Sequence, residues 1–270
     1  MILFVFEGAK REKTIFNTIK QLYFKEAQTF VYSYCSNIYS LYQDMKSLDV
    51  FGDSADIVSL LKTRDESKKL LQNYNSSDFS EIYLFFDYDA IQNKLTDCNT
   101  TIKELLKYFS NETEKGKLYI NYPMVESIRY YKNALPDPDY YEYTVSATVG
   151  SNFKKLADND SKYKNLDFLC AKIKKYADLN QNHYEKIGRI PSEDEINKFR
   201  ENWYHVIKLN VYKANFICKR SNDCPTSKDD ISQSLIFSSQ ISNYIEPKKE
   251  IAILNAFPLF IYEYLKEINI

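Results

Sequence analysis

Apolar residues run directly into two aspartates at Ile82-Tyr83-Leu84-Phe85-Phe86-Asp87-Tyr88-Asp89. The chain opens in a similar way, because Phe4-Val5-Phe6 leads into Glu7-Gly8. Short continuous apolar runs rich in β-branched and aromatic residues are typical of strands buried on both faces of a parallel sheet. Chemistry gathers at the carboxyl ends of such strands, so acidic side chains that follow two of them can share one crevice. Carboxylate oxygens clustered in this way suit Mg²⁺ or Mn²⁺.

The first half of the chain alternates between strand and helix patterns. Strands are predicted over residues 2–6, about 29–35, 82–86 and 117–120, and helical segments over about 14–25, 37–71 and 97–109. Right-handed crossovers between parallel strands place the intervening helices on the two faces of the sheet. The predicted fold class is therefore α/β, with a parallel sheet of four strands flanked by helices and a mainly helical C-terminal region.

A proline-rich turn separates the two regions. Pro136-Asp137-Pro138-Asp139 interrupts the pattern, since each proline removes a backbone donor and disfavours helix in the residue before it. We predict one domain over residues 1–135 and a helical region over 136–270, with helices near 162–184, 192–219 and 231–241. Ser192 and Glu195 form a capping-box pattern at the start of the second of these helices.

Composition limits the classes of protein to which the chain can belong. The 36 Lys and Arg residues nearly balance the 37 Asp and Glu residues, so a polyanionic partner would need a local basic patch. Only five glycines are present, and no glycine-rich phosphate loop is found. Five scattered cysteines argue against a disulfide framework and favour a reducing compartment. With no signal-peptide pattern and no long apolar stretch, we predict a soluble cytoplasmic protein without membrane contact.

The order of the acidic motifs resembles the TOPRIM fold of type IA and type II topoisomerases, bacterial primases and OLD-family nucleases. A strand followed by Glu-Gly and a later strand followed by Asp-x-Asp carry this resemblance, which covers about the first 130 residues. Glu12 stands five residues after Glu7, which is similar to the pattern in TOPRIM-related proteins of the RloB and AbiL type. The segment Asn121-Tyr122-Pro123-Met124-Val125-Glu126 is similar to an asparagine-proline segment of the same proteins, with one residue between Asn121 and Pro123.

The resemblance implies a nuclease of bacterial anti-phage, abortive-infection defence. It places Glu7, Asp87 and Asp89 at the catalytic centre and makes Glu12 and Glu126 further ligands of Mg²⁺ or Mn²⁺. A partner ATPase is implied as well, and a homo-oligomer is compatible with it. Lys10, Arg11 and Lys13 lie near the start of the first helix, where backbone N–H groups also favour phosphate, so we predict that they hold the DNA or RNA backbone.

Plainer explanations exist for each motif. Asp-x-Asp is frequent in strand-end turns, Glu-Gly can simply start a loop, and Glu12 can complement a helix dipole or pair with a lysine. The site can also belong to a non-catalytic regulatory or binding subunit, or to an enzyme that transfers or hydrolyses phosphate on a small nucleotide. The order of the motifs favours the catalytic interpretation, because both motifs end apolar runs and Glu126 follows the next strand.

The remaining chemical candidates are weaker. His183 and His205 lie apart from any acidic or cysteine cluster, and Cys218 with Cys224 form at most half of a zinc site. The apolar segment over residues 251–268 is predicted to be core, with partner docking as the alternative. A basic region of the second half is either a solvated face or a nucleic-acid contact, and it comprises Lys154, Lys155, Lys162, Lys164, Lys172, Lys174 and Lys175.

Overall fold

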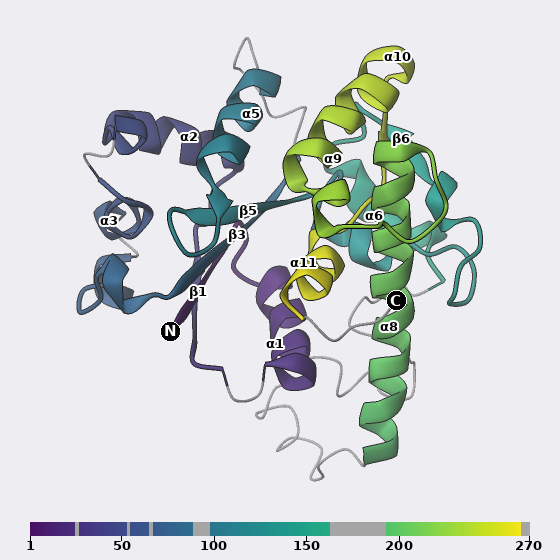
Figure 1. The fold of residues 1–270 in the computed structure, drawn as a ribbon, viewed down its shortest axis with the longest axis horizontal. Helices are drawn as coiled ribbons and strands as arrows, with labels where there is room; N and C mark the ends of the chain where they lie inside the picture. Colours follow the sequence, from purple (N-terminus) through teal and green to yellow (C-terminus); the bar gives the residue numbers. More distant parts are fainter. Residues whose placement is uncertain (25–26, 53–54, 65–66, 89–97, 163–192, 266–270) are drawn as a thin grey trace.

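A mostly parallel sheet of five strands organises the protein (Figure 1). The computed structural model describes residues 1–24, 27–52, 55–64, 67–88, 98–162 and 193–265. The strand order is β2-β1-β3-β5-β4. The strands are β1 (Ile2–Phe6), β2 (Thr29–Ser33), β3 (Glu81–Asp87), β4 (Ser110–Asn111) and β5 (Gly116–Asn121). Strands β2, β1, β3 and β5 run parallel, and the short β4 pairs antiparallel with β5.

The two central strands are the apolar runs that precede the acidic motifs. Every residue of β1 is buried, and so is every residue of β3 after Glu81. β1 pairs with β2 on one side and with β3 on the other, so neither face nor edge of β1 is open to solvent. Strands buried in this way are typical of parallel sheets covered by helices on both faces.

Helices from both halves of the chain cover the sheet. Figure 1 shows α1 (Arg11–Tyr23) and α11 (Ala256–Tyr264) on one side of the strands, and α2 (Ile38–Ser47) and α5 (Cys98–Tyr108) on the other. On the first side, Phe4 of β1 contacts Phe16 of α1 and Phe260 of α11, with ring centroids 4.2 and 5.6 Å apart. Aromatic side chains thus join the beginning and the end of the chain in one core.

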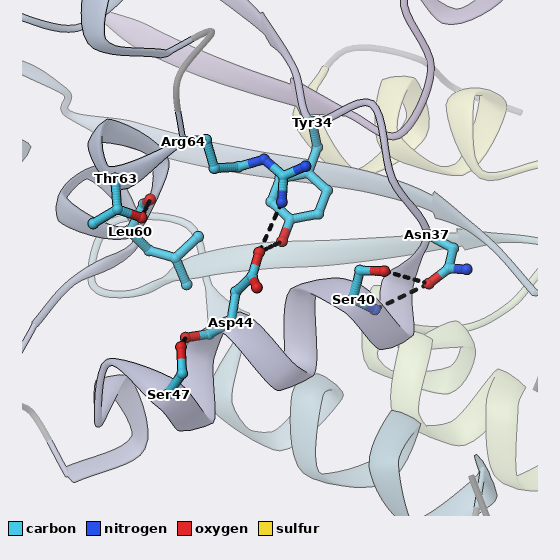
Figure 2. Close-up of polar contacts among 8 residues, drawn as sticks. All are labelled: Tyr34, Asn37, Ser40, Asp44, Ser47, Leu60, Thr63 and Arg64. Carbon is cyan, nitrogen blue, oxygen red and sulfur yellow. Dashed lines mark hydrogen bonds and ion pairs between the residues drawn. The ribbon is translucent and has the colours of Figure 1, made fainter. Parts of the chain in front are cut away.

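A small polar cluster holds the segment after β2 against its helices (Figure 2). The Tyr34 hydroxyl donates to Asp44 of α2, and the Arg64 guanidinium lies 2.7 Å from the same carboxylate and 4.1 Å from the centre of the Tyr34 ring. Asn37 caps α2 by accepting from the Ser40 N–H at 2.9 Å. These contacts fix α2 and the residue after α3 (Ile57–Thr63) to the carboxyl end of β2.

The rest of the first half contains the remaining short helices, which are η1 (Val50–Gly52), α4 (Ser67–Leu70) and η2 (Ser76–Asp78). Beyond β5 the described chain is mainly helical, with a two-stranded antiparallel ribbon of β6 (Thr144–Ser146) and β7 (Glu250–Ala252). Its helices are η3 (Val125–Arg129), η4 (Tyr140–Glu142), α6 (Asn152–Asp160), α8 (Glu193–Lys219), η6 (Lys228–Ile231), α9 (Gln233–Gln240), the π-helical turn η7 (Ile241–Ile245) and α10 (Glu246–Lys248).

The predicted α/β class, the four parallel strands and the helical C-terminal region are confirmed at this level. The TOPRIM fold and the boundary at residues 135 and 136 stay predictions. The predicted helix over 162–184 lies almost entirely outside the described residues, as does Ser192 of the capping-box pattern. The antiparallel strands β4, β6 and β7 were not predicted, because runs of two or three residues carry no readable alternation.

Candidate functional site

The carboxyl ends of three neighbouring strands each carry an acidic or amide side chain. Glu7 follows β1, Asp87 ends β3 and Asn121 ends β5. Asp87 and Asn121 are register partners in the sheet. The Glu7 backbone N–H donates to Phe85 at 3.0 Å, while the Glu7 carboxylate accepts from the Asp87 backbone N–H at 2.9 Å. The two strand-end acids are therefore adjacent although 80 positions separate them.

Asp87 lies in surroundings that oppose its negative charge. Its side chain is buried, and its carboxylate accepts one hydrogen bond from the Asn121 amide at 3.0 Å. Burial raises the pKa of Asp87 well above its usual value, and the nearby charges of Glu7, Glu12 and Glu126 raise it further. The Asn121 hydrogen bond acts in the opposite direction. Four carboxylates from separate segments thus act on one another at this edge of the sheet.

Glu12 is turned inward from the first turn of α1. It is only 4% exposed, and its carboxylate accepts from the Gly8 backbone N–H at 2.9 Å. Burial raises the pKa of Glu12, and the charge of Glu126 adds to this effect. Lys154 lowers the same pKa, so this lysine lies within electrostatic reach of the carboxylate. Glu12 is therefore buried in the first turn of α1 and within electrostatic reach of both Glu126 and Lys154.

Glu126 enters the same place from η3, the turn that follows β5. The residue is 5% exposed, and its Oε2 atom has no hydrogen-bond partner among the described residues. The Nζ atom of Lys154, on α6, lies 3.9 Å from Oε1. Leaving a buried carboxylate oxygen without a donor is costly, and a bound cation is one way to offset this cost.

The donors fit a hard divalent cation in kind and charge. Glu7, Glu12, Asp87 and Glu126 offer only oxygen atoms, which Mg²⁺ and Mn²⁺ prefer. In the part of the chain that the structure describes, however, no three Asp, Glu, His or Cys side chains are grouped so that they could hold a metal ion. Asp89 lies outside the described residues. Carboxylates of like charge repel each other, so a cation is the group that would draw them together.

The three basic residues predicted to hold a phosphate backbone lie beside this cluster in the sequence. Lys10 is exposed, and Arg11 and Lys13 are half-buried in the first turn of α1. Their contact with nucleic acid stays a prediction. Lys154 approaches two of the carboxylates, those of Glu126 and Glu12. The sequence alone places Lys154 only in the basic region of the second half.

The other candidates do not form sites among the described residues. His205 is half-buried on α8, and His183 lies outside those residues. Burial raises the pKa of Cys218 to about 11, which disfavours the thiolate that a zinc site needs. Of the basic region, Lys155 and Lys162 are exposed. Of the apolar segment near the C-terminus, residues 251–261 are core, because all of them are buried, and residues 266–268 lie outside the described residues.

Comparisons with protein-family models, with curated proteins and with solved structures found no match for this chain. The TOPRIM resemblance therefore rests on the sequence motifs. Among the described residues, no helix is long and apolar enough to cross a membrane.

Proposed function

We propose that this protein is a Mg²⁺- or Mn²⁺-dependent nuclease with a TOPRIM-like centre, which cleaves phosphodiester bonds of DNA or RNA in anti-phage defence. One observation carries the proposal: the Glu7 carboxylate accepts from the Asp87 backbone N–H at 2.9 Å, and buried Asp87 lies within electrostatic reach of buried Glu12 and Glu126. Perturbed carboxylates of this kind gather at functional sites. The defence role, the abortive-infection outcome and the partner ATPase rest on the resemblance of the motifs alone.

The proposal gives each acidic residue a role. Glu7 and Asp87, with Asp89, would hold the ion nearest the reacting phosphate, while Glu12 and Glu126 would complete the ligand set. Divalent ions in such a site stabilise the charge on the phosphate and lower the pKa of the attacking water. The Lys154 side chain is 58% exposed and close to Glu126, so it can attract a phosphate from solvent.

The first test compares the wild type with Asp87→Asn, which keeps the size of the side chain and removes its charge. Purified proteins are incubated with Mn²⁺ or Mg²⁺ and with duplex DNA, single-stranded DNA or transfer RNA. Cleavage by the wild type should fall at least about 100-fold in the variant, since one ligand of the ion is lost. Asp229→Asn, a change at an exposed residue of η6, is the matched control and should leave cleavage unchanged.

A partner protein can keep a defence nuclease silent, so the same variants are also expressed in bacteria with the neighbouring genes and challenged with phage. Growth arrest and nucleic-acid cleavage that depend on Asp87 support the proposal. Full protection by Asp87→Asn contradicts it and favours a non-catalytic binding subunit. Cleavage restricted to free nucleotides would favour the small-nucleotide enzyme.

A further inference from the structure

Residues at the start of α11 are hydrogen-bonded to the segment that carries Asn121 and Glu126. Leu254 forms an antiparallel bridge with Tyr122, the residue after β5, through two backbone hydrogen bonds of 2.8 and 3.0 Å. This bridge places Asn255 and Ala256 next to the segment that carries Asn121 and Glu126. A segment more than 100 positions further along the chain thus packs against the segment that carries Asn121 and Glu126.

The first link runs through Asn121 to Asp87. The Asn121 amide nitrogen donates to Asp87 Oδ1 at 3.0 Å, and its amide oxygen accepts from the Ala256 N–H at 3.0 Å. Both ends of a planar amide are therefore engaged, which fixes the direction of the donor. Asn121 is 1% exposed, so water does not compete for these bonds.

The second link runs through Asn255 to the turn that carries Glu126. The Asn255 amide nitrogen donates to the Val125 carbonyl at 3.1 Å and to Ser127 Oγ at 3.0 Å. These two residues flank Glu126 in η3. The Asn255 amide oxygen accepts from the Phe257 N–H at 3.1 Å and so caps α11.

Helix α8 holds Asn255 in turn. The Asn255 backbone N–H donates to Asn210 Oδ1 at 2.9 Å, and the Asn210 amide nitrogen donates to the Tyr131 hydroxyl at 2.9 Å. Asn210 and Asn255 are both fully buried. Connected buried hydrogen bonds of this kind specify one arrangement, because a broken bond would leave a polar group without water.

We infer that Asn255 is a positioning residue that fixes the Asp87 and Glu126 carboxylates relative to each other, so that both can bind one divalent ion. The Asn255 side chain donates to Val125 and Ser127, the two neighbours of Glu126. The backbone N–H of the next residue, Ala256, donates to Asn121, which in turn donates to Asp87. This inference rests on the proposed metal-dependent function. It makes the start of α11, which lies in the predicted helical region, a structural part of the metal site.

The test is the affinity of the purified full chain for Mn²⁺, measured by titration calorimetry well below the unfolding temperature. Asn255→Asp keeps the oxygen that caps α11 and replaces the nitrogen that donates to Val125 and Ser127. Gln240→Glu is the matched control, because buried Gln240 of α9 donates to the Ala252 carbonyl at 2.7 Å and accepts from the Ala252 N–H at 3.0 Å. Both changes convert a fully buried amide to a carboxyl group of the same shape.

We expect Asn255→Asp to weaken Mn²⁺ binding at least about 10-fold, the usual effect of losing a residue that supports metal ligands. Gln240→Glu should leave the affinity within about two-fold of the wild type, since it contacts neither carboxylate segment. An unchanged affinity in Asn255→Asp, or equal losses in both variants, overturns the inference and leaves the proposed function intact.

The same Mn²⁺ titrations cover two further cases. A wild type that binds no Mn²⁺ removes the proposed function and this inference with it. Should Asn255→Asp not fold, Ser127→Ala replaces it, because this smaller change removes the hydroxyl that accepts from Asn255 and donates to the Leu254 carbonyl at 3.2 Å. Unchanged Mn²⁺ affinity in folded Ser127→Ala overturns the inference in that case.

Discussion

Gly8 is required by the close approach of one carboxylate. A Cβ atom at this position would stand 2.6 Å from Glu12 Oε2 and 2.8 Å from Oε1, closer than real Cβ contacts allow. The same carboxylate accepts from the Gly8 N–H. The Glu-Gly motif after β1 therefore does more than end a strand: the missing side chain gives Glu12 its place beside the backbone.

Gly8→Ala should displace the Glu12 carboxylate without unfolding the protein. The atoms in conflict are the far end of a flexible side chain, so we expect a stability loss of about 1 kcal/mol or less and a clear drop in Mn²⁺ affinity. Thermal unfolding and Mn²⁺ titration of the same samples measure the two effects. Ala9→Gly, at the exposed next residue, is the control. Normal Mn²⁺ affinity in Gly8→Ala would show that the position of Glu12 is unimportant for the metal.

At the scale of elements, α11 joins the core of the sheet to the acidic edge. Phe257, the second residue of α11, stacks on Phe85 of β3 with ring centroids 4.5 Å apart and planes 11° apart. Its ring centroid lies 5.8 Å from that of Phe6 in β1. Its ring is fully buried. The helix that supports Asn121 is thus anchored to β1, which Glu7 follows, and to β3, which ends in Asp87.

Phe257→Ala should cost about 3–5 kcal/mol in the free energy of unfolding, the usual range for losing a buried aromatic ring. Urea denaturation followed by circular dichroism measures it. Leu235→Ala on α9 is the control, since Leu235 is 38% exposed and should cost less than about 1 kcal/mol. A loss in Phe257→Ala as small as the control would mean that α11 is not an integral part of the core.

The sequence could predict features that depend on local patterns, but not contacts between segments far apart in the chain. Local patterns were sufficient for β1 and β3, because a buried strand needs a continuous apolar run and the strand-end acids follow it directly. No local pattern reveals that Asn255 meets Val125, since the contact joins segments 130 positions apart through one side chain. Lys154 was visible as part of a basic region, but only the packing of α6 against η3 places it near Glu126.

For the molecule as a whole, the raised pKa values of the acidic cluster make stability depend on pH. The folded protein raises the pKa of Asp87 and of Glu12 above their ordinary values of 3.8 and 4.5. Folded protein therefore binds more protons than the unfolded chain from about pH 4 up to these raised pKa values. Stability without metal should fall as the pH rises through this window, because ionisation places unpaired charge in the interior.

The pH dependence of stability has the opposite sign for a carboxylate that is paired with a lysine. Lys219 and Thr226 lower the pKa of Asp230 to about 2, so the stability that Asp230 contributes is present above its ordinary value and is lost as the pH falls toward about 2. The two effects thus occupy separate pH ranges. A pH series above about pH 5 reports mainly on the raised carboxylates, and the comparison with Asp87→Asn isolates the share of Asp87.

We expect the unfolding temperature of the wild type in EDTA to fall more between about pH 5 and pH 8 than that of Asp87→Asn, which has no charge to bury at this position. Mn²⁺ should raise the wild-type value, and more so at higher pH, because the ion binds ionised carboxylates and competes with protons. At 100 times the dissociation constant, binding adds about 2.7 kcal/mol. Differential scanning fluorimetry of both proteins, with and without Mn²⁺, measures all four curves. Parallel curves for the two proteins would contradict the account of Asp87 as a buried acid that a cation keeps ionised.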